Sequence, residues 1–190
     1  MNRIEALRSR GISCALYDDP INIRYLTGYT GEGSLLVLPD RAVIITDFRY
    51  VEQAQRQSPF CDLERVDADR GTNAILAEAL AKAGLHELAI EENIVTVSRL
   101  HAMEKALPGI HLTALPETVL EMRTVKDEGE LDCIRKALAI SCQAFDDLLG
   151  VIHAGMTEKR ACAELNHFMN LRGSEGNAFD TIVASGVNGS

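Results

Sequence analysis

The chain has 190 residues, with 19 Lys and Arg against 28 Asp and Glu, and its formal net charge is −9. This acidic balance argues against nucleic acid or an anionic membrane as the main partner, because both attract basic patches. No apolar run is long enough to span a bilayer, and residues 1–5 start no apolar signal core. The five cysteines are irregularly spaced, which is typical of reduced thiols, so we expect a cytoplasmic protein.

The chain opens with a predicted helix and strand. Ile4 and Leu7 lie one helical turn apart and Gly11 follows as a stop, which predicts a helix over residues 3–10. The apolar run over residues 12–17 is followed by two aspartates and a proline. That boundary favours a short buried strand.

A β-hairpin is predicted next. The apolar runs over residues 35–38 and 42–45 flank a Pro-Asp-Arg segment, and a Pro-Asp turn between two such runs is typical of a hairpin. Neither run alternates apolar with polar residues. We therefore expect the hairpin to be covered on both faces.

Helices and strands continue to alternate after the hairpin. Helical periodicity over residues 73–83 ends at Gly84, and Thr96 precedes a predicted helix over 97–107 as its N-cap. The other predicted elements are a polar helix over about 51–57, strands at 88–90 and near His111, and a short helix begun by Pro116. These patterns predict an α/β domain with a mixed sheet flanked by helices.

A second segment begins with strong helix signals. Asp127 with Glu130 forms a capping-box pattern, and the helix should run to about Leu149. Its apolar stripe consists of Leu131, Ile134, Leu138, Phe145 and Leu148 or Leu149.

Thr157 is the predicted N-cap of another helix, with a core face made by Leu165, Phe168 and Met169. A short strand is then expected over residues 180–184, with a tight turn starting at Ser185.

Several motifs in this order carry a resemblance. They are Tyr25-Leu-Thr-Gly28, Thr46-Asp47-x-Arg49-Tyr50, Arg123-x-Val-Lys126-Asp127-x-x-Glu130-Leu131, Gly155-Met-Thr-Glu158, and Phe179-Asp-Thr-Ile-Val-Ala-Ser-Gly186 with Asn188-Gly189. The chain resembles the pita-bread metallopeptidases, which include Xaa-Pro aminopeptidases, prolidases, methionine aminopeptidases and creatinase. Val187 departs from the pattern, because proline-directed members often carry proline there.

The resemblance implies two domains. Residues 1–123 would be a creatinase-like N-terminal domain with a mixed sheet flanked by helices, which methionine aminopeptidases lack. Residues 124–190 would be the truncated start of an α+β pita-bread catalytic domain, with two helices and the first strand.

The resemblance also implies metal-assisted hydrolysis of short peptides with proline at the second position. Two divalent ions, Mn²⁺ or similar, would be held by two Asp, one His and two Glu and would share a hydroxide that attacks the scissile carbonyl. In the family these ligands lie beyond the motif that ends near residue 190. We therefore expect no catalytic or metal-binding residue and no activity in this chain alone.

The resemblance further implies a homodimer of the full-length enzyme. We expect the chain to be a fragment of an aminopeptidase or a prolidase, which its residues do not separate, and a degenerate gene product is the alternative. We also expect the isolated chain to associate, to swap its C-terminal helices or to leave them mobile. A different class of function, a non-catalytic pita-bread-type protein-interaction module, would be favoured by a stop codon or missing ligands after codon 190.

No other catalytic motif is present. His86-Glu87 lacks the second histidine of H-E-x-x-H, and the glycines near residue 30 form G-x-x-G-x-G, which is not the dinucleotide fingerprint. Glu91 and Glu92 are predicted to be a solvated surface pair, because neighbours on a strand point apart. The remaining histidines, expected at the surface or in caps, are His101, His111, His153 and His167.

Two groups of site residues follow from the resemblance. Phe179 and Ile182 match positions that border an apolar substrate pocket beside the metals, and core packing is the alternative. Strand alternation would put them on opposite faces unless the segment is bent. Asp47, Arg49 and Tyr50 match residues that shape the cleft of the other subunit in a dimer; alternatively, Asp47 caps the next helix while Arg49 pairs locally.

Overall fold

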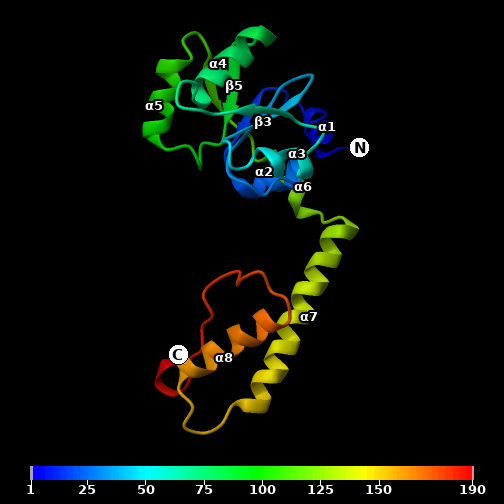
Figure 1. Cartoon of the computed structure of the whole chain (residues 1–190), viewed down its shortest axis with the longest axis vertical. Helices are drawn as coiled ribbons and strands as arrows, with labels where there is room; N and C mark the ends of the chain where they lie inside the picture. Colours follow the sequence, from blue (N-terminus) through cyan, green and yellow to red (C-terminus); the bar gives the residue numbers. More distant parts are fainter. Residues whose placement is uncertain (1, 190) are drawn as a thin grey trace. The chain divides into compact units, whose positions relative to one another are not determined.

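The computed structural model describes residues 2–189. The chain divides into two compact units, Met1–Val125 and Lys126–Ser190 (Figure 1). This division falls two residues after the boundary expected from the sequence, at the start of the signals around Asp127.

The first unit is built on a six-stranded mixed sheet with the strand order β4-β3-β2-β1-β5-β6. The antiparallel pairs are β1–β2 and β2–β3, and the parallel pairs are β1–β5, β3–β4 and β5–β6. The strands are β1 (Ala15–Tyr17), β2 (Ser34–Val37), β3 (Ala42–Thr46), β4 (Asp62–Arg65), β5 (Glu87–Ile90) and β6 (His111–Ala114). The expected hairpin is therefore confirmed as β2 and β3.

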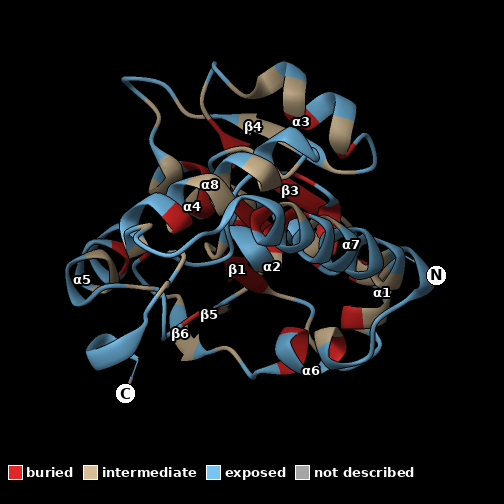
Figure 2. Cartoon of the chain, turned by 90° about the horizontal axis from the view of Figure 1, so that it is seen from below, coloured by how far each residue is buried: buried red, intermediate tan, exposed pale blue. Residues whose placement is uncertain are grey.

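Helices cover both faces of this sheet. One face packs against α1 (Arg3–Arg8), α2 (Pro20–Thr27), α3 (Val51–Gln57) and α6 (Thr118–Thr124), and the other against α4 (Thr72–Ala83) and α5 (Val97–Ala106). Every residue of β1, β2 and β3 is buried, as the apolar runs predicted (Figure 2). The sequence prediction of a mixed sheet flanked by helices is confirmed.

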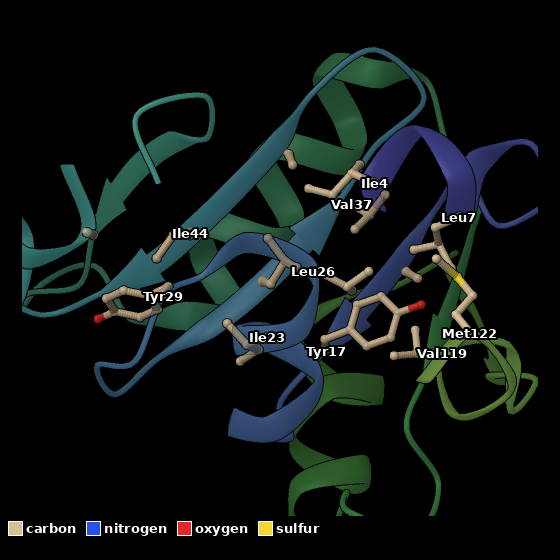
Figure 3. Close-up of a cluster of buried hydrophobic side chains, with 14 residues drawn as sticks. Ile4, Leu7, Tyr17, Ile23, Leu26, Tyr29, Val37, Ile44, Val119 and Met122 are labelled. Atoms are coloured by element: carbon tan, nitrogen blue, oxygen red, sulfur yellow. The ribbon is translucent and has the colours of Figure 1, made fainter. Parts of the chain in front are cut away.

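Alternation along the strands sorts the core into two clusters. In β1, Ala15 and Tyr17 face the first cluster, with Ile4 of α1 and Ile23 of α2, whereas Leu16 faces the second. Figure 3 shows the first cluster, where side chains from α1, α2 and α6 meet those of the sheet. Since successive strand residues point to opposite faces, a purely apolar strand fits only between two layers of helices.

Two elements of this unit were not predicted. Asp19 caps α2 by accepting a hydrogen bond from the amide of Ile21, Pro20 occupies the first turn, and Gly28 ends the helix at φ 82°. The Asp-Pro pair therefore starts a helix as well as ending a strand. The other missed element, β4, lies at the sheet edge and has no fully buried residue, so its sequence carries little apolar pattern.

The second unit consists of α7 (Glu128–Val151) and α8 (Glu158–Leu171), which pack against each other, and a C-terminal segment. Both expected caps are confirmed: Asp127 and Glu130 form a capping box, and Thr157 accepts from the amide of Arg160. Among the described residues of this unit, the buried hydrophobic ones are Ala144, Leu148 and Ala161. Much of the predicted apolar stripe of α7 is exposed, namely Ile134, Leu138, Phe145 and Leu149.

The expected strand over residues 180–184 is wrong. These residues are irregular, and a 3₁₀ turn at Gly186–Asn188 follows where the tight turn was predicted. A strand needs a neighbour to pair its N–H and C=O groups. Within residues 2–189, the strands all belong to the sheet of the first unit, so an apolar run alone did not make a strand here.

None of the helices in the described part of the chain is both long and apolar enough to cross a membrane.

Candidate functional site

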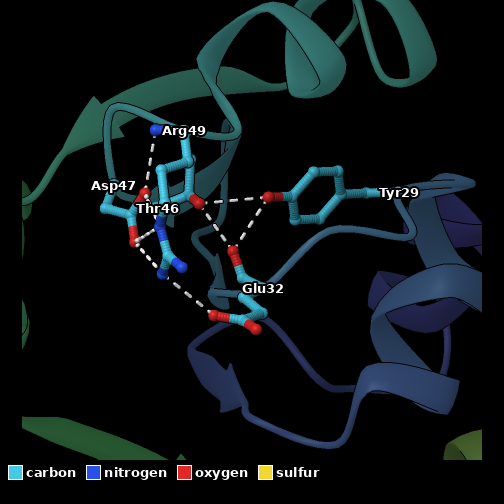
Figure 4. A network of polar contacts seen from close by, with 5 residues as sticks. All are labelled: Tyr29, Glu32, Thr46, Asp47 and Arg49. Carbon is cyan, nitrogen blue, oxygen red and sulfur yellow. Dashed lines mark hydrogen bonds and ion pairs between the residues drawn. The ribbon is translucent and has the colours of Figure 1, made fainter.

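A polar cluster lies on the surface of the first unit, where the chain leaves β3. The guanidinium of Arg49 contacts both carboxylate oxygens of Asp47, with Nε–Oδ1 at 3.0 Å and Nη2–Oδ2 at 2.6 Å. The same Nη2 lies 3.1 Å from Oε2 of Glu32. Figure 4 shows Arg49 between the two carboxylates, which leaves the three side chains with one net negative charge.

Two buried hydroxyl groups hold the backbone of this cluster in place. The Tyr29 hydroxyl donates to the carbonyl oxygen of Glu32 at 2.8 Å, and Thr46 Oγ1 donates to the same oxygen at 2.5 Å. The two hydroxyl oxygens are 3.0 Å apart (Figure 4). Tyr29 and Thr46 are both buried, so the backbone of Glu32 is fixed by groups that belong to the core.

Glycines allow the loop around Glu32 to approach the sheet. A Cβ atom at Gly33, where φ is 147°, would lie 2.4 Å from the carbonyl oxygen of Ile45. A Cβ atom at Gly31 would lie 2.4 Å from the hydroxyl oxygen of Tyr29. The G-x-x-G-x-G pattern therefore serves close packing of this loop rather than phosphate binding.

The electrostatics of the cluster follow from these contacts. Hydrogen bonds from the side chain and backbone of Arg49 lower the pKa of Asp47, and the Asp47 carboxylate raises the pKa of Arg49. Desolvation, with Glu32 nearby, raises the pKa of Tyr50. The guanidinium carbon of Arg49 lies 5.1 Å from the centroid of the Tyr50 ring, within cation–π range.

The structure thus brings Asp47, Arg49 and Tyr50 together and adds Glu32, which sequence reasoning missed. Arg49 does pair locally, as the alternative held. Asp47, however, does not cap α3, because its carboxylate accepts from the amide of Arg49 while α3 begins at Val51 without a side-chain cap. The charged groups of the cluster pair with one another, and Phe48 beside it is 75% exposed, so the cluster is suited to contact with another molecule.

Glu91 corrects a second expectation. It was predicted to be solvated with Glu92, yet it is only 4% exposed, whereas Glu92 is exposed. Its Oε2 accepts from the amides of Asp18 at 2.6 Å and Asp19 at 2.8 Å, and its Oε1 accepts from Asn22 Nδ2 at 2.6 Å. Glu91 therefore holds the N-terminus of α2 against the end of β5, which is a structural role. Four histidines predicted to lie at the surface or in caps are exposed: His101, His111, His153 and His167.

Phe179 and Ile182 lie in the C-terminal segment and point into solvent. Their side chains are 75% and 82% exposed, so the core-packing alternative is not what the structure shows. Thr181 and Val183, which alternate with Ile182, are half-buried. This alternation survives although the segment is not a strand.

The residues present do not fit a dinuclear metal centre. From Asn2 to Gly189, no group of three or more His, Cys, Asp or Glu side chains is arranged to hold a metal ion. The carboxylates of the polar cluster are paired with Arg49, and Glu91 is committed to backbone amides.

Comparison with known proteins decides the family. Residues 2–125 match the family model of the creatinase/prolidase N-terminal domain. The chain belongs to the creatinase/prolidase family. Further along the chain, residues 132–190 match the family model of metallopeptidase family M24.

Individual relatives of this creatinase/prolidase chain are peptidases. The uncharacterized peptidase YqhT of Bacillus subtilis is 31% identical over 193 residues, which cover 99% of this chain and 54% of that protein. The X-Pro aminopeptidase structure from Thermotoga maritima has a TM-score of 0.86 at 32% identity and covers 95% of this chain and 52% of its own. The Xaa-Pro dipeptidase structure from Bacillus anthracis has a TM-score of 0.91 at 31% identity and covers 98% and 53%. The chain spans about half the length of these relatives.

Proposed function

We propose that this chain is the N-terminal domain and the opening of the catalytic domain of a metal-dependent Xaa-Pro peptidase. The substrates would be short peptides with proline at the second position. One observation carries the proposal: the two family models match in order along one chain, 2–125 and then 132–190. It is supported by the structures of an X-Pro aminopeptidase and an Xaa-Pro dipeptidase, which align with nearly the whole chain.

On this proposal, the metal ligands come from the part of the relatives' length that this chain does not span. Two divalent ions, Mn²⁺ or a similar metal, would supply a hydroxide nucleophile and polarise the scissile carbonyl. The 190-residue chain alone would be inactive. Its five free cysteines support a cytoplasmic location.

The proposed roles of this chain's own residues are binding and exclusion. Phe179 and Ile182 would offer an apolar wall to the proline ring, which their exposure permits. Asp47, Arg49 and Tyr50 would narrow the cleft of the other subunit in a homodimer and so restrict the enzyme to short peptides. The support for this second role is that contacts within the chain already hold these side chains in place.

The test uses the intact protein from its complete reading frame, loaded with Mn²⁺. We expect hydrolysis of an Xaa-Pro dipeptide or an Xaa-Pro-Yaa tripeptide, loss of activity with a chelator, and recovery when Mn²⁺ is restored. Cleavage of only the dipeptide would identify a prolidase, and cleavage of the tripeptide an aminopeptidase. The 190-residue chain, tested in parallel, should neither cleave the peptides nor take up two Mn²⁺.

A non-catalytic interaction module is the competing outcome of the same test. An intact protein that lacks the five ligands, or that binds no metal and cleaves neither peptide, would overturn the peptidase proposal.

A further inference from the structure

The C-terminal segment leaves three large apolar side chains exposed. Phe179, Ile182 and Val187 are 75%, 82% and 94% exposed. The segment over residues 174–185 has no regular secondary structure. Burial of these three side chains and a strand ladder therefore do not explain its position, whereas polar contacts with α8 do.

Glu158, in the first turn of α8, holds the end of the segment. Its Oε1 accepts from the amide of Ser185 at 2.7 Å, and its Oε2 accepts from Asn188 Nδ2 at 3.0 Å. The Ser185 hydroxyl and Asn188 Nδ2 also lie 3.4 Å and 3.2 Å from Oε1. An ionised carboxylate is suited to this place because it only accepts hydrogen bonds and can receive several donors at once.

Asn166 and Cys162 hold the middle of the segment. The Oδ1 atom of Asn166 accepts from Thr181 Oγ1 at 2.6 Å and from Asn177 Nδ2 at 3.0 Å. The Cys162 thiol donates to the carbonyl oxygen of Thr181 at 3.4 Å. Thr181 thus has both its side chain and its backbone attached to α8.

These three anchors form one stripe. Positions 158, 162 and 166 are spaced by four residues, so they share one face of α8. Their partners follow in reverse order along the chain: Asn177 and Thr181 at Asn166, and Ser185 and Asn188 at Glu158. The segment therefore runs back along the helix, and Thr181 faces the stripe while Ile182 faces away.

We propose that Glu158, Cys162 and Asn166 are positioning residues that fix the segment carrying Phe179 and Ile182. They would hold these two side chains toward solvent, ready to receive the proline side of a substrate. The substrate role rests on the proposed function, whereas the anchoring rests on the contacts alone. Glu158, Cys162 and Asn166 would not themselves contact the substrate.

The anchoring is tested in the 190-residue chain by amide hydrogen exchange measured by NMR. Glu158→Ala should lower the protection of the Ser185 amide about tenfold, the effect of one charge-assisted hydrogen bond. Glu158→Gln keeps a carbonyl acceptor and should restore part of that protection. The matched control is Glu164→Gln, because Glu164 also lies on α8 but pairs with Arg160.

An unchanged Ser185 exchange rate in Glu158→Ala would overturn the anchoring, provided that the amides of α8 stay protected. Loss of protection throughout α8 would assign Glu158 to helix stability and would overturn the proposal as well. Asn166→Ala gives an independent reading, because it should speed exchange around Thr181 and leave Ser185 much less affected.

The substrate role is tested in the intact protein with an Xaa-Pro peptide. Glu158→Ala should raise KM about tenfold and change kcat less, since the segment binds and does not react, and Glu164→Gln should leave both unchanged. A fall in kcat with unchanged KM, or no change in either constant, would overturn the substrate role. If the wild-type protein cleaves no Xaa-Pro peptide, the proposed function and the substrate role both fail, while the exchange result still decides the anchoring.

Discussion

The carboxylate of Glu91 accepts a hydrogen bond from the backbone amide of Asp19 at 2.8 Å, across 72 residues of sequence. The same oxygen accepts from the amide of Asp18, and the other oxygen accepts from the side chain of Asn22. A carboxylate at the end of β5 thus satisfies donors at the start of α2. This arrangement connects the chain just after β1 to the chain just after β5, its parallel neighbour in the sheet.

Glu91→Ala should therefore destabilise the first unit by about 3 kcal/mol, because it leaves three half-buried donors without their acceptor. Glu92→Ala is the matched control and should cost less than about 0.5 kcal/mol, since Glu92 is exposed. Denaturant unfolding can be followed by tyrosine fluorescence, because the chain has no Trp and its four Tyr all lie before residue 51. Equal stability of the two variants would contradict the role of Glu91.

The tyrosine hydroxyls of the core give a second comparison. The Tyr29 hydroxyl contacts the Glu32 carbonyl and Thr46, whereas the Tyr17 hydroxyl is buried with no partner among the described residues, and burial beside Glu91 raises the pKa of Tyr17. Tyr29→Phe should cost about 1 kcal/mol, and Tyr17→Phe should be neutral or stabilising. The same unfolding assay measures both, and a larger loss from Tyr17→Phe than from Tyr29→Phe would refute the comparison.

Gly33 is the third position where the geometry predicts a large effect. Gly33→Ala combines a φ of 147° with a Cβ atom only 2.4 Å from the carbonyl oxygen of Ile45. This oxygen belongs to the backbone of β3, which cannot move away at low cost. We expect a loss of about 2–4 kcal/mol. Gly71→Ser is the control, because Gly71 has an extended φ of −81°, caps α4 without a side-chain bond and has open space around it, so serine should be neutral or slightly stabilising.

Local signals predicted much of the fold. The capping box at Asp127 and Glu130, the cap at Thr96 and the β2–β3 hairpin each depend on residues within a few positions of one another. The expected strand over residues 180–184 failed because pairing is a non-local property, and an apolar run does not reveal whether a neighbouring strand exists.

The candidate site also combines residues that are close in sequence with residues that only the fold brings together. Asp47, Arg49 and Tyr50 are adjacent in sequence, so a short motif could identify them together. Glu32 reaches Arg49 only because β2 and β3 pair, and no local signal marks it. The prediction for Glu91 was wrong for the same reason, because its partners lie at and just before the start of α2, a helix that was not predicted.

The Asp47–Arg49 pair predicts a pH effect of known sign. Since hydrogen bonds from Arg49 lower the pKa of Asp47 in the folded state, the pair contributes stability above the unfolded pKa of about 3.9, and this contribution is lost as the pH falls through the lower folded pKa. Carbon-13 NMR titration should give Asp47 a pKa below that of an ordinary aspartate. Arg49→Gln should move the Asp47 pKa upward, while Arg41→Gln, which removes the contacts of Arg41 with Asp40 and Asp62, should leave it in place.

The five cysteines should separate by reactivity. Burial, with Glu87 nearby, raises the pKa of Cys14 to about 11, and burial with Asp62 nearby raises the pKa of Cys61 to about 11. At pH 8 only about one in a thousand of these thiols is ionised, and the thiolate is the reactive form. Cys133 and Cys142 are exposed on α7, so a thiol reagent should modify these two first. Replacing both with serine should remove the fast phase, and fast labelling of Cys14 or Cys61 in the folded chain would show that the first unit opens far more readily than its packing implies.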